Sequence, residues 1–136
     1  RVGTGVDPKR LAMIVAVLSR HAGIALGQAD VFVNVAGGVR IDEPGADLAI
    51  ALAIASAARG APVAERLAAF GEVGLTGRLR PATQAERRLE ECAKLGLRAV
   101  LSPPGAGTRG GIRLVEADTV RRAVAAGLAT AESTAA

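Results

Sequence analysis

The stretch "IDEPGADLAIALAIA", residues 41–55, joins an acidic turn to an apolar helix made mostly of small residues. Two carboxylates precede its proline, and the predicted helix, at about 45–57, opens on a glycine. Glycine is a poor helix former, so its place in the first turn needs a specific reason. The alternating segment "DVFVNV", residues 30–35, predicts a strand just before this turn.

Helix and strand patterns alternate on both sides of this stretch. Asp7 and Pro8 predict the N-cap and first residue of a helix that stops at Gly23. A hairpin with its turn near Thr76 and Gly77 is predicted within residues 67–81. The remaining expected elements are a helix at 83–95 opened by a capping box of Thr83 and Glu86, a strand at 97–103, a glycine-rich loop at 103–111, a strand at 112–117 and a helix from Asp118 to about Ala126.

Strands that alternate with helices in this way predict a mostly parallel sheet covered by helices. The hairpin adds one antiparallel pair. The predicted fold class is therefore mixed α/β (α+β), a two-layer arrangement with a mostly parallel sheet, one antiparallel hairpin and helices packed on it.

Composition narrows the possible functions. The 136 residues suit one domain, half of them are apolar, and Phe32 and Phe70 are the only aromatic side chains, which argues against a base-stacking surface. No apolar run reaches the ~20 residues of a membrane span, and no signal-peptide pattern is present. We therefore expect a cytoplasmic protein with no membrane partner. The single cysteine, Cys92, predicts a buried, inert thiol.

Positive charge is concentrated in the second part of the chain. The formal net charge is +4, and residues 78–136 carry ten basic against six acidic side chains. Fifteen of the seventeen cations are arginines, whose planar guanidinium suits bidentate contact with phosphate. Two interpretations stay open: a polyanionic partner, or arginine enrichment that follows from a GC-rich coding sequence.

Two long segments carry a family resemblance. "QADVFVNVAGGVRIDEPGADLAIALAIAS" and "FGEVGLTGRLRPATQAERRLEECAKLGLRAVLSP" resemble the C-terminal Lon-protease-like domain of RadA-type (Sms) DNA repair proteins, over about residues 5–128. The resemblance implies a Lon proteolytic-domain-like fold over 1–128, followed by a disordered tail at 129–136.

The resemblance also places the Lon catalytic dyad. Matching the Lon motifs puts the nucleophilic serine at Gly45 and the catalytic lysine at Glu86. Glycine has no hydroxyl to attack with, and a carboxylate cannot act as the neutral amine of a Ser-Lys pair. We therefore expect this chain not to be an enzyme.

Other residues give no obvious replacement dyad. Lys9 and Lys94 have solvated positions at helix ends, and His21 lies near a helix end where a cation favours the dipole. The serines lie outside a strained nucleophile elbow: Ser19, Ser56, Ser102 and Ser133. The alternative function is a residual serine peptidase or peptide-binding domain of the Lon type.

The acidic cluster has more than one interpretation. The cluster consists of Asp42, Glu43 and Asp47; of these, Glu43 and Asp47 would be favoured at a helix N-terminus or could pair with arginines of a neighbouring subunit. A divalent cation is a second interpretation, but there is no regularly spaced ligand loop, so we predict no metal site. The 103–111 loop lacks the Lys-Ser or Lys-Thr ending of a P-loop and leads into a strand, so no nucleotide is expected there.

The resemblance implies a role within a larger protein. RadA-like proteins join a zinc finger, a RecA-type ATPase and this domain, and act as hexameric, ATP-driven motors that extend branches during recombination. We expect ATP, Mg and Zn only in the missing N-terminal parts, and no cofactor in this domain. The domain would scaffold a homo-hexameric ring and contribute to binding of double-stranded or branched DNA. Its candidate DNA contacts are Arg78 and Arg80 at the hairpin turn, Arg87 and Arg88 in the next helix, and Arg109.

Overall fold

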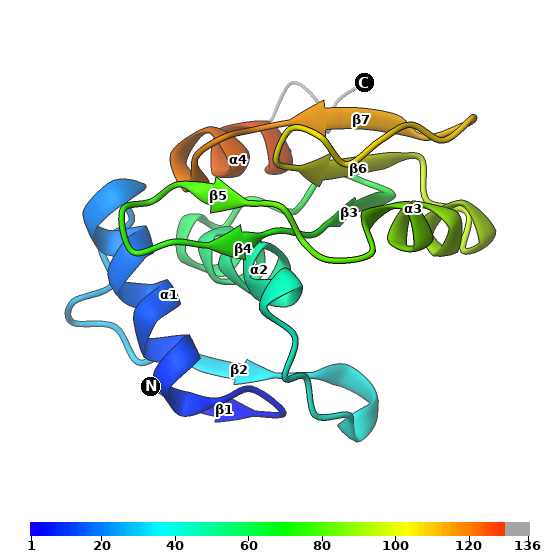
Figure 1. Ribbon diagram of the computed structural model, residues 1–136. Coiled ribbons are helices and arrows are strands. Elements are labelled where there is room, and N and C mark those ends of the chain that lie inside the picture. The colour runs from blue at the N-terminus through cyan, green and yellow to red at the C-terminus, as the bar shows by residue number, and fades with distance from the viewer. Residues whose placement is uncertain (130–136) are drawn as a thin grey trace.

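The computed structural model describes residues 1–129, in which α-helices alternate with short strands (Figure 1). In chain order the elements are β1 (Val2–Thr4), α1 (Pro8–His21), β2 (Phe32–Asn34), the single 3-10 turns η1 (Ala36–Gly38) and η2 (Pro44–Ala46), α2 (Asp47–Arg59), β3 (Leu67–Ala69), β4 (Glu72–Val73), β5 (Leu79–Arg80), α3 (Ala85–Lys94), β6 (Ala99–Ser102), β7 (Arg113–Glu116) and α4 (Val120–Gly127). The predicted tail lies outside the described residues except for Ala129, whose N–H donates to the Pro62 carbonyl at 2.7 Å.

The strands of residues 1–129 form three small sheets instead of one continuous sheet. The largest has the order β3-β6-β7 and is parallel throughout. β1 pairs with β2 in parallel, and β4 pairs with β5 antiparallel. The predicted class is confirmed: mixed α/β, with mostly parallel strands and one antiparallel hairpin.

The middle strand of the largest sheet, β6, is buried along its whole length and separates two clusters of apolar side chains. Val100 packs with Leu89 and Cys92 of α3, whereas the next residue, Leu101, belongs to the main core with α1, α2 and α4. Successive side chains of a strand point to opposite faces, so α3 covers one face and the main core lies on the other. Cys92 is buried as predicted, and this burial raises the pKa of its thiol.

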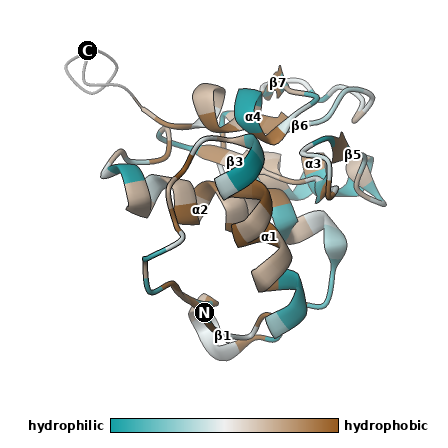
Figure 2. Ribbon diagram, turned by 90° about the vertical axis from the view of Figure 1, so that its left-hand side faces the viewer, coloured by the Kyte–Doolittle hydropathy of each residue, from teal (hydrophilic) through white to brown (hydrophobic). Residues whose placement is uncertain are grey.

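Helices α1 and α2 supply much of the main core, and Figure 2 shows hydrophobic residues along both. Helix α1 begins as predicted: Pro8 is its first residue, and the Asp7 carboxylate accepts the Arg10 backbone N–H at 3.0 Å. Its buried stripe includes Leu11 and Ile14. No helix within residues 1–129 combines the length and apolarity needed to cross a membrane.

Strand β1 was not predicted from the sequence. Its three residues, with Gly3 in the middle, carry too little alternation to mark a strand. It pairs with β2, the predicted strand at 30–35, with Val2 opposite Phe32. Figure 1 shows this pair set apart from the β3-β6-β7 sheet.

The predicted hairpin is confirmed, but its first strand is divided. β3 pairs with β6, and after Phe70 and Gly71 the chain leaves that sheet and pairs as β4 with β5. Gly77 lies in the turn with φ of +86°, a conformation that glycine adopts without steric cost. Its N–H donates to the Gly74 carbonyl at 3.0 Å.

Two predicted helix caps are wrong. Helix α3 begins after Gln84, which has a left-handed φ of 56° and makes no side-chain cap, so Thr83 and Glu86 form no capping box. Helix α4 is capped by Thr119, whose hydroxyl accepts the Arg122 N–H at 3.2 Å, and not by Asp118. At α4 the adjacent polar residues Asp118 and Thr119 are both suitable caps, and the tertiary path of the chain selects Thr119.

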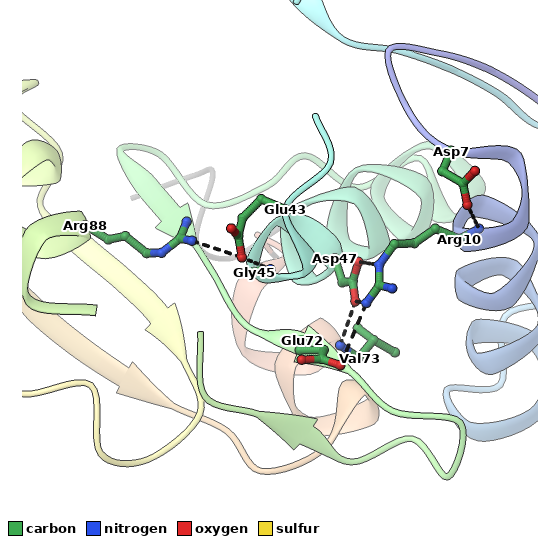
Figure 3. Close-up of polar contacts among 8 residues, drawn as sticks. All are labelled: Asp7, Arg10, Glu43, Gly45, Asp47, Glu72, Val73 and Arg88. Carbon is green, nitrogen blue, oxygen red and sulfur yellow. Dashed lines mark hydrogen bonds and ion pairs between the residues drawn. The ribbon is translucent and has the colours of Figure 1, made fainter. Parts of the chain in front are cut away.

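The first residue of α2, Asp47, makes a buried ion pair that joins three elements (Figure 3). Its Oδ1 accepts from Arg10 Nε and its Oδ2 from Arg10 Nη2, both at 2.6 Å. Oδ2 also accepts the Val73 backbone N–H at 3.1 Å. One carboxylate therefore connects α1, α2 and β4.

Several features offset the free-energy cost of burying the Asp47 carboxylate. The Asp47 side chain is 1% exposed, while 31% of the Arg10 side chain still reaches solvent. The paired geometry is bidentate, and the helix N-terminus favours a negative charge. The hydrogen bond to Asp47 raises the pKa of Arg10, so this guanidinium stays charged at all ordinary pH values.

We expect Asp47→Ala to lower the free energy of unfolding by about 3 kcal/mol, at the low end for a broken buried pair because Arg10 keeps partial access to water. The substitution also leaves the Val73 N–H without its acceptor. Urea titration followed by far-UV circular dichroism measures the effect. The control is Asp42→Ala, which breaks the exposed pair with Arg40 and should change stability by less than about 1 kcal/mol. Equal effects of the two substitutions would contradict this assignment.

Candidate functional site

The turn that precedes α2 is anchored by its own side chain and by the neighbouring chain segment. The Glu43 carboxylate accepts the Gly45 N–H at 3.1 Å, and Pro44 opens the 3-10 turn. The Gly45 carbonyl accepts the Gly71 N–H at 2.9 Å, and the Gly71 carbonyl accepts the Leu48 N–H at 3.1 Å. The helix therefore starts at Asp47, two residues later than predicted, after a turn held against the junction of β3 and β4.

Glycine is favoured at position 45 because Ala82 and the flexible end of the Arg88 side chain lie close beside it. A Cβ at this position would lie 2.9 Å from Arg88 Nη2 and 3.0 Å from Ala82 Cβ. Real Cβ atoms essentially never lie under 3.0 Å from a neighbouring heavy atom, and contacts of 3.0–3.4 Å are rare. The glycine at the start of this helix is thus explained by close approach.

The side chain that closes over the turn is Arg88, which projects from α3 toward Glu43 and Gly45 (Figure 3). Its Nη2 lies 3.4 Å from Glu43 Oε1, and its Nε donates to the Thr83 carbonyl at 2.8 Å. The guanidinium also lies over the Phe70 ring, with Cζ 5.9 Å from the centroid. Arg88 is therefore held inside the chain by an ion pair, a hydrogen bond and an aromatic ring.

The three clustered carboxylates are each paired with a different arginine of the same chain. Asp42 pairs with Arg40 at 3.0 Å, Glu43 with Arg88, and Asp47 with Arg10. These pairs lie within one chain, and pairing of the carboxylates with arginines of a neighbouring subunit stays a prediction. Within residues 1–129, no three His, Cys, Asp or Glu side chains are grouped as metal ligands would be.

The two predicted dyad positions differ in burial. Gly45 is buried beneath Arg88, whereas Glu86 lies exposed in the first turn of α3. Neither position supplies a nucleophile or an amine.

The contacts of the described serine and lysine side chains do not bring a serine together with a lysine. Ser56 Oγ donates to the Ala61 carbonyl at 2.6 Å, and Ser102 Oγ is fully buried without a hydrogen-bond partner. Lys94 Nζ lies 3.6 Å from Glu91 Oε1, and Lys9 is exposed at the start of α1. Ser133 lies outside the described residues.

The other arginines predicted to contact DNA lie on the surface. Arg78 and Arg80 are exposed at the β4–β5 hairpin, Arg87 is exposed on α3, and Arg109 is exposed in the loop between β6 and β7. Arg88 differs from them because it is partly buried and paired. The structure thus separates Arg88 from the exposed set, although it is adjacent to Arg87 in sequence.

The surface of residues 1–129 includes an aliphatic hollow and a polar hollow. The larger, about 580 Å³, lies between β2 and α2, and its lining is mostly aliphatic with Asp30 as the one charged residue. The smaller, about 350 Å³, is polar and is lined by His21, Thr76, Gly77, Arg78, Asp118, Thr119, Arg121 and Arg122. Arg121 and Arg122 were not predicted as site residues, although two consecutive arginines at a helix start are a visible signal in the sequence.

Comparison with known proteins places the chain in a family. A family model described as subunit ChlI of Mg-chelatase matches residues 9–106. The DNA repair protein RadA of Haemophilus influenzae is 41% identical over 122 residues, which cover 90% of this chain and 27% of the relative. RadA of Escherichia coli is 47% identical over 103 residues, which cover 76% of this chain and 22% of the relative. RadA of Brucella abortus is 44% identical over 134 residues, which cover 93% of this chain and 29% of the relative.

The chain spans about a quarter of the length of these curated relatives. They confirm the predicted likeness to RadA-type proteins, while the likeness to Lon proteases stays a prediction. The match over residues 9–106 shows that the chain belongs to the family described as subunit ChlI of Mg-chelatase, with similarity to DNA repair proteins named RadA over most of its length.

Proposed function

We propose that this chain is the non-catalytic, Lon-like module of a RadA-type DNA repair and recombination ATPase of the cytoplasm. In this role it scaffolds a hexameric ring and contributes to double-stranded DNA binding during branch migration. The relatives' name, DNA repair protein RadA, supports the repair part of the proposal. In this proposal, ATP hydrolysis with its Mg and a zinc finger with its Zn belong to parts of the longer parent protein outside this chain.

The observation that carries the non-catalytic assignment is the closure of the Gly45 turn. Arg88 fills the space where a side chain at position 45 would project, and Glu43 and Thr83 hold it there. A serine at this position would be crowded by the guanidinium. The closed turn therefore supports a structural role for position 45 and counts against a serine nucleophile there.

The surface arginines support the DNA-binding part. Arg78 and Arg80 project from a hairpin whose turn is fixed by backbone hydrogen bonds, so little ordering is needed for them to contact a phosphate. Arg87 and Arg109 supply further exposed cations. In a hexamer each such interaction would be repeated in every subunit, so each subunit would need only a few of them.

A protease substrate and a serine-reactive probe test the peptidase alternative. We expect neither cleavage of casein nor labelling by a fluorophosphonate probe, because no described serine has an activating base. Gel fluorescence and mass spectrometry of the labelled chain are the measurements. Covalent label on any serine, Ser133 included, would favour the peptidase over the scaffold.

The closed turn predicts a specific packing cost. Gly45→Ala should lower the free energy of unfolding by about 1 to 3 kcal/mol, because the new methyl group meets Arg88 and Ala82. The matched control is Gly27→Ala, where a Cβ meets nothing within 4 Å. Adding Arg88→Ala to Gly45→Ala should recover part of the loss in the same urea titration. A cost at position 45 no larger than that at position 27 would be evidence against the closure.

Duplex DNA binding should depend on the hairpin. In a fluorescence anisotropy titration of the chain with a labelled duplex, Arg78→Ala combined with Arg80→Ala should weaken binding. The log–log salt slope should fall by about 0.9 for each phosphate that the variant no longer neutralises. Thermal stability should not change, because both side chains are exposed. Arg40→Ala, at an exposed arginine outside the candidate set, is the control, and equal slopes for all three proteins would contradict the proposal.

A further inference from the structure

The polar hollow of about 350 Å³ is built by three segments that are distant in sequence. His21 comes from the end of α1, Thr76 to Arg78 from the β4–β5 turn, and Asp118 to Arg122 from the start of α4. Figure 1 shows this hairpin turn reaching toward the end of α1, on the side where α4 lies.

Backbone hydrogen bonds fix the walls of this hollow. The Gly77 carbonyl accepts the Val120 N–H at 2.8 Å, and the Asp118 carbonyl accepts the Leu79 N–H at 2.9 Å. Gly77 lies directly against His21: a Cβ on this glycine would be 2.8 Å from His21 Cβ. The hollow is therefore a preformed feature of the fold and needs no loop rearrangement to exist.

The charges in the lining favour an anion. Three arginines, Arg78, Arg121 and Arg122, stand against one carboxylate, Asp118. Arg122 donates to Asp118 at 2.9 Å, and this hydrogen bond lowers the pKa of Asp118, so the carboxylate is charged at neutral pH. Two cations are therefore left without a counter-charge in the lining.

The arginines are positioned to bind through their side chains. Arg121 Nε donates to the His21 carbonyl at 3.2 Å, which holds this guanidinium at the edge of the hollow. Among the described residues, the Arg78 guanidinium makes no hydrogen bond or ion pair and is free to turn inward. The Val120 and Arg122 backbone N–H groups already have acceptors within the chain. An anion here would thus be held by guanidinium groups, which suit the tetrahedral oxygens of a phosphate.

We propose that this hollow, named here the arginine pocket (His21, Arg78, Asp118, Arg121 and Arg122), seats one backbone phosphate of duplex DNA. This inference rests on the proposed DNA-binding function and gives it a location. It differs from binding by the hairpin alone, because Arg121 takes part and Arg80 lies outside the lining.

The test compares variants of the full chain in duplex anisotropy titrations from low to high salt. Arg78→Ala with Arg121→Ala should lower the salt slope by about 0.9, the value for one bound phosphate. Asp118→Asn should tighten binding, because it removes the one negative charge of the lining; a gain of this kind cannot come from misfolding. No loss in the double variant, or no gain in Asp118→Asn, would overturn the inference.

Two further measurements separate the arginine pocket from the exposed cations elsewhere on the surface and from a site for free phosphate. Arg87→Ala and Arg109→Ala remove exposed cations outside the pocket. If they weaken binding while the pocket variants do not, the DNA-binding function stands and the pocket assignment falls. If the unmodified chain binds no duplex, the proposed function itself fails.

A titration with inorganic phosphate, followed by the amide chemical shifts of residues 118–122, tests whether the arginine pocket binds free phosphate instead. Shifts of these amides, together with no effect of the pocket variants on duplex binding, would refute the DNA assignment.

Discussion

The pairing of Asp47 with Arg10 is the constraint on which the rest of this fold depends. It fixes the start of α2 against α1, and its hydrogen bond to the Val73 N–H fixes both against β4. The Gly45 turn precedes this residue directly, and the hairpin that carries Arg78 follows Val73. The Gly45 turn and the hairpin that carries Arg78 are thus both positioned by the Asp47 carboxylate, which has almost no exposure to water.

The turn at Gly45 is held closed by side chains of the chain itself. Glu43 uses one carboxylate oxygen both for the Gly45 N–H and for Arg88, so the turn and α3 are held together. The same guanidinium contacts the Phe70 ring, which lies beside the junction with β4. Each interaction is modest, but together they place the Arg88 guanidinium where a side chain at position 45 would project.

The sequence predicted what is encoded locally. Asp7 and Pro8 marked the start of α1, and the apolar run of β6 and the glycine of the hairpin turn identified their elements. Contacts between distant residues were beyond this kind of reasoning. The carboxylate that pairs with Arg88, Glu43, lies on the other side of the hairpin in sequence, so no local pattern could show that Arg88 is paired while the adjacent Arg87 is exposed. The arginine pocket was missed for the same reason, since His21, Arg78 and Arg121 meet only in the folded chain. Short strands such as β1 acquire their structure from pairing, which no local pattern encodes.

The parallel pairing of β3, β6 and β7 has a consequence for how the chain reaches its native state. β3 and β6 are separated by about thirty residues, and so are β1 and β2. Parallel neighbours require a long connection to close before any ladder hydrogen bond forms, which makes such topologies slow to fold. On a ribosome, β3 would emerge well before its partner β6, and Leu101, the residue that joins the main core from β6, would arrive later than α1 and α2. The first half of the chain must therefore wait, with its apolar helices incompletely covered, until the second half has been synthesised.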